Sequence, residues 1–248
     1  MSTIIVAAQA MPDNPFFIAI NRDEFPDRPG LPPIIGYDSP TPILGPTDEK
    51  TGGTWFGVSP LGHVAALTNR YGVPYRPGPP SRSWLVMEAL RRRRADAVEC
   101  VLEAIQTRTY NAFHLIVADA SGTDLVVWDG EHIKHSPLHN DRIRVFTECS
   151  RTGAFDFRCG WLDHEIEDLR DINKVTPQRL LRLLKHHEQR PLDGTCIHAP
   201  MSGYETRSST CFWIEANGTA HLLHAEGPPC RAYYEDYSDL AASFLTTE

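Results

Sequence analysis

The sequence feature that most constrains the fold is a polar cluster at residues 21–24, Asn-Arg-Asp-Glu, which directly follows an apolar run near the start of the chain. Residues 3–9 and 16–20 are mostly apolar and of strand length, and the segment between them is dense in Pro, Asp and Asn. Two such runs around a group of turn formers are typical of a β-hairpin. The sequence therefore predicts an early hairpin whose second strand ends in four polar residues, a pattern that packing alone does not explain.

Antiparallel pairing in this hairpin brings Ser2 to the polar cluster. If Gln9 lies opposite Phe16, the one-for-one register places Ser2 opposite Asp23. A Met followed by a small residue is commonly trimmed in cells, and Ser2 would then carry a hydroxyl nucleophile and a free α-amine. An α-amine has an ordinary pKa of about 7.7–8.0 and can act as general base. We therefore predict an N-terminal nucleophile, with Arg22 lowering the pKa of the amine and Asp23 orienting the ammonium. A polar strand end with a solvated salt bridge is the alternative.

Composition narrows the function classes. The chain has 248 residues, of which 41% are hydrophobic and 23% charged, so we expect a single large layered domain over residues 1–248. The formal net charge of −8 argues against nucleic acid as the main partner, and the four arginines at 91–94 are interpreted as a solvated helix face. No apolar run approaches the ~18 residues of a membrane span.

The cysteine pattern indicates reduced thiols rather than disulfides. The six cysteines are widely scattered, and the sequence has no CxxC motif. A chain of this length does not need disulfides for stability, so we expect reduced thiols and a cytoplasmic protein. No metal-ligand spacing stands out. The closest is Cys196-Ile197-His198, which alone is a weak signal.

Apolar segments separated by turn formers predict many antiparallel strands with a few helices between them. Apolar periodicity places helices at 83–93 and 95–106, and Thr176-Pro177 is a good start for another. The Pro- and Gly-rich segments 25–46 and 71–80 are expected to be irregular loops that line a site. This combination predicts an α+β fold in which two stacked antiparallel sheets carry helices on the outside.

Two residues near these loops are candidates for binding or catalysis. Asn69 ends a predicted strand, where it can cap a turn or offer its amide N–H to a developing oxyanion. Trp55 follows paired glycines and can form a pocket wall or belong to the core.

Six short motifs occur in order along the chain: Asn-Arg-Asp-Glu at 21–24, Gly-Gly-Thr-Trp at 52–55, Ala-Leu-Thr-Asn at 66–69, Tyr-Asn-Ala-Phe at 110–113, Thr-Arg-Ser-Ser at 206–209 and Gly-Pro-Pro-Cys at 227–230. Together they resemble the NRDE family, which includes the homologues of transport and Golgi organisation protein 2. The resemblance runs from residue 2 to around residue 237. The ordered set is specific, whereas any one motif would be weak.

The resemblance implies the fold of N-terminal nucleophile hydrolases, a four-layer αββα sandwich. The family is also similar to the cysteine amidases that cleave bile-salt and penicillin amides, in which an N-terminal Cys is both nucleophile and base. By motif position, Asp23 resembles the Asp after their first hairpin, Asn69 resembles their oxyanion Asn, and Arg207 resembles a late Arg that supports the nucleophile. Arg22 is offset from their early Arg. Ser2 stands where the family usually has Cys.

These observations predict a hydrolase-like protein that cleaves a linear amide or ester. Ser2 would attack, Asn69 would bind the oxyanion, and Arg22, Asp23 and Arg207 would organise the terminus. The second Asn of the amidases has no clear match, because Thr-Glu at 147–148 occupies the comparable region. Hydrolysis of this kind requires no cofactor, and the expected partner is a small molecule.

The resemblance also implies an alternative, a non-catalytic haem or lipid trafficking protein on the same fold. His198 with Cys196, or else His63, would then supply axial ligands to a haem, and Trp55 and Phe56 would line an apolar pocket. The opposing interpretation of each histidine is an ordinary loop or surface residue. Neither function involves nucleic acid or stable insertion in a membrane.

Overall fold

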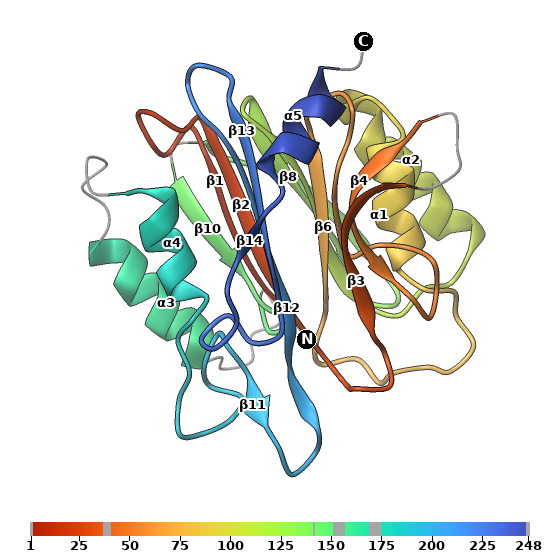
Figure 1. The fold of residues 1–248 in the computed structure, drawn as a ribbon. Helices are drawn as coiled ribbons and strands as arrows, with labels where there is room; N and C mark the ends of the chain where they lie inside the picture. The colour runs from red at the N-terminus through yellow and green to blue at the C-terminus, as the bar shows by residue number, and fades with distance from the viewer. Residues whose placement is uncertain (1, 37–40, 141, 151–156, 169–174, 247–248) are drawn as a thin grey trace.

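Two antiparallel sheets are stacked face to face, with helices on both outer sides (Figure 1). The computed structural model describes residues 2–36, 41–140, 142–150, 157–168 and 175–246. In hydrogen-bonded order the first sheet consists of β10 (Arg142–Phe146), β1 (Ser2–Ala8), β2 (Phe16–Glu24), β12 (Tyr204–Ile214), β13 (Ala220–Glu226) and β14 (Glu235–Asp236), with β11 (His198–Ala199) paired to β12. The second consists of β3 (Gly30–Gly36), β4 (Ile43–Asp48), β5 (Phe56–Val58), β6 (Val64–Asn69), β7 (Phe113–Asp119), β8 (Gly122–Trp128) and β9 (Ile133–Leu138). The predicted α+β sandwich is therefore confirmed.

Helices α1 (Ser83–Leu90) and α2 (Arg94–Thr107) cover the outer face of the second sheet, as the apolar periodicity predicted. Helices α3 (Phe157–Asp168) and α4 (Pro177–Leu183) cover the first sheet. The cap of α4 is also as predicted, since the hydroxyl of Thr176 accepts from the N–H of Arg179. Helix α5 (Ser238–Leu245) contacts both β13 and β3 and closes one end of the space between the sheets (Figure 1). Among the described residues, no helix combines the length and apolar character that a membrane crossing requires.

The central strands β1 and β2 are buried on both faces, which explains their almost continuous apolar sequence. Successive side chains of a strand point to opposite faces of the sheet. Ile4, Val6, Ile18 and Ile20 belong to the core between the sheets, whereas their neighbours Ile5, Ala7, Phe17 and Ala19 pack in the layer with α3 and α4. Each of these apolar residues therefore belongs to one of two buried layers.

The register of the first hairpin differs from the prediction by one residue. Ala8, not Gln9, lies opposite Phe16, so Ser2 pairs with Arg22 rather than with Asp23. The reason is local. Gln9 has φ of +55°, which turns the chain out of the strand, and its N–H bonds to the carbonyl of Pro15 over 2.8 Å.

The segment 25–46 contains strand where an irregular loop was expected. Strand β3 and the start of β4 lie within it, while residues 37–40 fall outside the described residues. Pro32 and Pro33 are tolerated because β3 is at the edge of its sheet, where a missing N–H costs no ladder bond, and the pairing shifts register between Leu31 and Ile34. The second predicted loop, 71–80, carries neither helix nor strand.

Asn21 ties the central strand to the helical layer behind it. Its side chain is fully buried, and its amide donates to the carbonyls of Leu184 and Thr195, at 2.8 Å each. Those carbonyls lie at the end of α4 and in the loop that leads to β11. The first residue of the polar cluster is thus structural.

Asn21→Ala is expected to lower the free energy of unfolding by about 2–4 kcal/mol, because two buried carbonyls lose their donor at a cost of ~1–3 kcal/mol each. Urea denaturation measures this loss. Gln106→Ala, which removes an amide from the exposed face of α2, is the matched control and should change the stability little. A loss at Asn21 no larger than that at Gln106 would contradict the structural role.

Candidate active site

The alternation of β2 divides the polar cluster between two sides of the sheet. Arg22 extends toward the second sheet, where its guanidinium stacks over Trp55 at 4.3 Å and lies 4.0 Å from the Asp48 carboxylate. Asp23 faces the other way, accepting a hydrogen bond from the Thr206 hydroxyl at 2.7 Å and lying 4.0 Å from Arg158 of α3. The side chains of Arg22 and Asp23 therefore lie on opposite faces of the first sheet.

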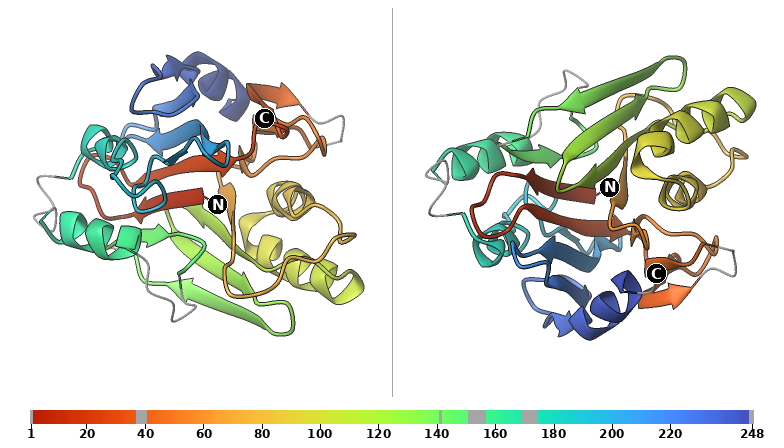
Figure 2. Two further views of the ribbon diagram at one scale, coloured as in Figure 1. Left: turned by 90° about the horizontal axis from the view of Figure 1, so that it is seen from below. Right: turned by 90° about the horizontal axis from the view of Figure 1, so that it is seen from above.

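Ser2 lies at the wall of a cavity of about 310 Å³ where the two sheets meet. Its carbonyl accepts from the hydroxyl of Thr68 at 3.2 Å, which fastens the start of β1 to the end of β6. Both views of Figure 2 show the start of β1 beside β6. Asn69, the last residue of β6, is half-buried and lines the same cavity. Of the five predicted site residues, the structure brings together Ser2, Arg22, Asp23 and Asn69.

Cations and carboxylates share the lining of this cavity. Arg28 bridges Asp48 and Glu24, with N···O distances of 2.6 and 3.2 Å, and Arg22 donates to the Arg28 carbonyl at 2.9 Å. Burial lowers the pKa of Arg22, and the charge of Asp48 opposes that shift. This network could not be predicted from the sequence, because Arg28, which joins the hairpin to strand β4, lies in the segment 25–46 that was expected to be an irregular loop.

Arg82 is a further cation of the cavity that the sequence analysis did not identify. Its guanidinium donates to the Ala112 carbonyl at 2.8 Å, and no carboxylate lies within salt-bridge distance of it in the described part of the chain. Burial, followed by the charge of Arg28, lowers its pKa to about 10. A half-buried cation without a carboxylate partner favours an anionic group in the cavity.

Asp23 lies at the cavity wall, and its carboxyl is held by groups from α3 and β12. Burial raises its pKa to about 7, against the charge of Arg158 and the hydrogen bond from Thr206, which both stabilise the carboxylate. Arg158 also forms an ion pair with Glu148, the residue that stands near the place of the missing second Asn. Thr206 in turn accepts from the N–H of Ile197 at 2.7 Å.

Arg207 does not line the cavity that holds Ser2 and Asn69. The pairing of β12 with β2 shifts register between Thr206 and Ser208, so that Arg207 occupies a bulge. Its guanidinium contacts the Glu205 carboxylate at 2.6 Å and lines a neighbouring cavity of about 300 Å³, which shares Arg22 and Trp55 with the first. The motif position of Arg207 therefore does not translate into a contact with the Ser2 cavity.

The residues considered for haem binding fall in different places. His63 is 1% exposed and its Nε2 lies 3.1 Å from the Ala89 carbonyl of α1, so it is closed off from any ligand. Phe56 is a core residue between the sheets, and Trp55 is buried in that core but also borders both cavities. Cys196 and His198 do lie together, and neither lines the Ser2 cavity.

An apolar groove adjoins the cavity. Glu24 and Asn69 line both hollows, and the remaining walls of the groove, whose volume is about 590 Å³, are mostly apolar and include Phe25, Leu192 and Tyr204. A polar cavity and an apolar groove therefore meet at Asn69.

Comparison with known proteins identifies the family and the fold. The model of the family described as Transport and Golgi organisation 2 matches residues 1–226. The Transport and Golgi organization 2 homolog of Mus musculus is 33% identical over 127 residues, which are 49% of this chain and 45% of that protein, and the homolog of Bos taurus is 31% identical over 126 residues with the same coverage. The match thus spans less than half the length of these curated relatives.

Solved structures share the fold at low sequence identity. The Caenorhabditis elegans ortholog of N-acylethanolamine-hydrolyzing acid amidase has a TM-score of 0.56 and 17% identity, covering 84% of this chain and 91% of its own. A mutant of conjugated bile acid hydrolase from Clostridium perfringens has a TM-score of 0.56 and 11% identity, covering 96% and 93%. The four-layer sandwich therefore has the fold of N-terminal nucleophile hydrolases, as the family resemblance implied.

The raised pKa of Asp23 predicts a pH-dependent stability. Between pH 3.8, which is the ordinary pKa of this carboxyl, and pH about 7, the folded protein holds a proton that the unfolded chain releases. The contribution of Asp23 to stability is therefore fully present below about pH 4 and is lost as the pH rises to about 7.

Asp23→Asn, which can still accept from Thr206, should flatten this part of the pH profile. Urea denaturation of both proteins at several pH values between 4 and 8 measures the difference. Asp13→Asn, at an exposed position, is the control and should leave the profile unchanged. If the free energy of unfolding changes with pH equally in Asp23→Asn and in the unaltered protein, the pKa of the Asp23 carboxyl is not raised by its surroundings.

Proposed function

Since this chain belongs to the Transport and Golgi organisation 2 family and has the fold of N-terminal nucleophile hydrolases, we propose that it hydrolyses a small linear amide or ester with Ser2 as nucleophile. The observation that carries the proposal is the meeting of Ser2 and Asn69 in one polar cavity, at the ends of strands from opposite sheets. Removal of Met1 is required, because only then does Ser2 bear an α-amine.

The reaction uses groups of this chain alone. The Ser2 α-amine takes the proton of its own hydroxyl, and the oxygen attacks the substrate carbonyl carbon. An N–H of the Asn69 side chain donates to the oxyanion that forms. As the C–N or C–O bond breaks, the ammonium returns the proton to the leaving group, and water then releases the acyl group from Ser2 by the same proton route. Asp23 orients the ammonium, whereas Arg207 in the neighbouring cavity has no part in this proposed step.

The surroundings of Asn69 support an amphiphilic substrate. On one side lies the polar cavity, where Arg82 favours a carboxylate or another anionic group. On the other side lies the apolar groove with Phe25 and Leu192. A scissile carbonyl near Asn69 would then separate an anionic part from an apolar part of the substrate.

Free cysteines support a reducing compartment for this reaction. All six cysteines lie among the described residues and none is in a disulfide. We therefore propose a cytoplasmic location, because disulfides are rare where thiols are kept reduced.

A non-catalytic carrier of lipid or haem is the second candidate, and the apolar groove is the observation that favours it. In this version the groove receives the apolar ligand and Ser2 never becomes acylated. With His63 enclosed, a haem would have to take its axial ligand from His198 or Cys196. A Soret shift on adding haem that disappears in His198→Ala would support the haem version.

Intact-mass measurement distinguishes the two functions. The protein is expected to lack Met1 and to gain one acyl group from a β-lactone or activated ester, with a carboxylate-bearing probe reacting faster than its neutral analogue. Ser2→Ala should abolish the adduct, and Ser2→Cys should accelerate it because a thiol is the better nucleophile. Ser121→Ala, at an exposed turn, is the matched control. If the protein lacks Met1 and still forms no adduct with any probe, the hydrolase proposal is excluded and the carrier proposal remains.

Asn69→Ala is expected to slow acylation of Ser2 by ~10²–10³-fold, since one oxyanion donor is removed. Because the substitution acts on the transition state, the probe concentration that gives half-maximal rate should change much less. Rates of adduct formation as a function of probe concentration measure both quantities. A change confined to the half-maximal concentration would assign Asn69 to binding instead.

A further inference from the structure

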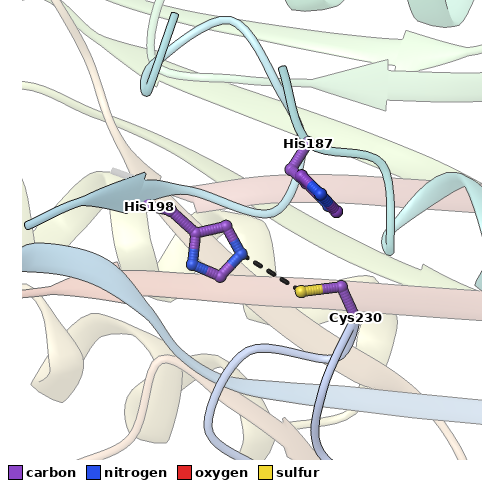
Figure 3. Close-up of side chains that lie close together, drawn as sticks. All are labelled: His187, His198 and Cys230. Atoms are coloured by element: carbon purple, nitrogen blue, oxygen red, sulfur yellow. Dashed lines mark hydrogen bonds between the residues drawn. The ribbon is translucent and has the colours of Figure 1, made fainter. Parts of the chain in front are cut away.

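Three side chains outside the candidate active site converge on one point. His187, His198 and Cys230 bring one ligand atom each within 4.8 Å of one another (Figure 3). His187 lies in the loop after α4, His198 in β11, and Cys230 in the turn after β13, within the Gly-Pro-Pro-Cys motif. None of them lines the Ser2 cavity. Cys230 is therefore brought to two histidines that lie 32 and 43 residues earlier in the sequence.

Cys196 adds a fourth donor to this cluster. The Nε2 atom of His198 lies 3.1 Å from Sγ of Cys230 and 3.5 Å from Sγ of Cys196. A tetrahedral zinc ion with Zn–N near 2.0 Å and Zn–S near 2.3 Å holds its nitrogen and sulfur ligands about 3.5 Å apart. The two distances from His198 Nε2 to the cysteine sulfurs thus come close to those between ligands of one bound ion.

We propose that Cys196, His198 and Cys230, with His187 completing the set, bind a single thiophilic transition-metal ion, for which Zn²⁺ is the best match. Two imidazoles and two thiols form the tetrahedral donor set that this ion takes in structural sites. The set includes no carboxylate, so it does not suit Mg²⁺ or Ca²⁺, which require oxygen ligands. Only the Cys-x-His spacing is visible in the sequence, because Cys230 comes from a distant turn.

The loop after α4, which carries His187 and Cys196, is held in place without an ion. The N–H of Cys196 bonds to the carbonyl of His186 at 2.7 Å. A side chain at Gly194 would place its Cβ 2.6 Å from the Cα of His187, so glycine allows the two ends of the loop to approach. The Nδ1 atom of His187 lies 3.4 Å from the carbonyl of Lys185, which leaves Nε2 as its ligand atom. The ligand atoms of this loop are therefore positioned before an ion binds.

An ion can reach this cluster from solvent. His187 is exposed, His198 and Cys230 are half-buried, and Cys196 is buried beneath them. Bound metal would join the loop after α4 and strand β11 to the turn after β13. It would fasten together peripheral segments of the first sheet and takes no part in the proposed hydrolysis.

Titration of the full chain with Co²⁺, a spectroscopic substitute for Zn²⁺, tests the proposal. After reduction and removal of adventitious metal, one equivalent should produce sulfur-to-cobalt charge-transfer absorption that added Zn²⁺ abolishes. Cys230→Ser and His198→Asn should each weaken binding by at least about tenfold, because each removes a ligand. The controls Cys100→Ser and His132→Asn lie outside the cluster and should bind as the unaltered protein does.

Circular dichroism checks that each variant is folded. Should a variant fail to fold, the unaltered protein provides a second measurement. Zn²⁺ is expected to slow the reaction of Cys196 and Cys230 with a thiol reagent, located by peptide mass, and to leave Cys100 unaffected. The proposal is overturned if the reduced, folded protein shows no charge-transfer band, if the band survives in both variants, or if Zn²⁺ protects neither thiol. These outcomes are independent of whether Ser2 is acylated.

Discussion

The burial of strand β2 on both faces is the constraint on which the rest of the structure depends. β2 pairs with β1 on one side and β12 on the other, so its backbone groups are engaged within the sheet. Its side chains must then alternate between the core that faces the second sheet and the layer of α3 and α4. The side chains of the polar cluster alternate in the same way. Arg22 extends toward Trp55 and the second sheet, whereas Asn21 and Asp23 form hydrogen bonds on the opposite face.

The sequence predicted the layers and most helices, because these follow from local apolar periodicity and capping. It did not predict features set by a single backbone conformation. The positive φ of Gln9 moved the hairpin register by one residue, and the bulge at Arg207 directed that side chain into another cavity. The prolines of β3 concealed a strand, since composition alone does not reveal that a strand lies at an edge.

The candidate site was predictable only in part for a related reason. Ser2 and Asn69 end their strands, and strand ends can be located from sequence. The charged groups around Arg22 and Asp23, such as Asp48 and Arg158, come from elements far apart in the chain, and charge pairing across such distances leaves no local pattern. The same holds for the metal-binding cluster, in which Cys230 joins a loop some 30 residues earlier. Motifs located the components, and only the fold determined which of them meet.

The hydrogen bond from Thr68 to the carbonyl of Ser2 has a consequence for maturation of the chain. This carbonyl lies on the C-terminal side of the peptide bond that joins Met1 to Ser2. Both the bond to Thr68 and the pairing of Ser2 with Arg22 involve atoms that an aminopeptidase would leave in place. The strand end would therefore resist fraying after the cut, and the new amine would emerge from a backbone already positioned by two neighbouring strands. Processing would create the reactive group without any refolding of the hairpin that holds it.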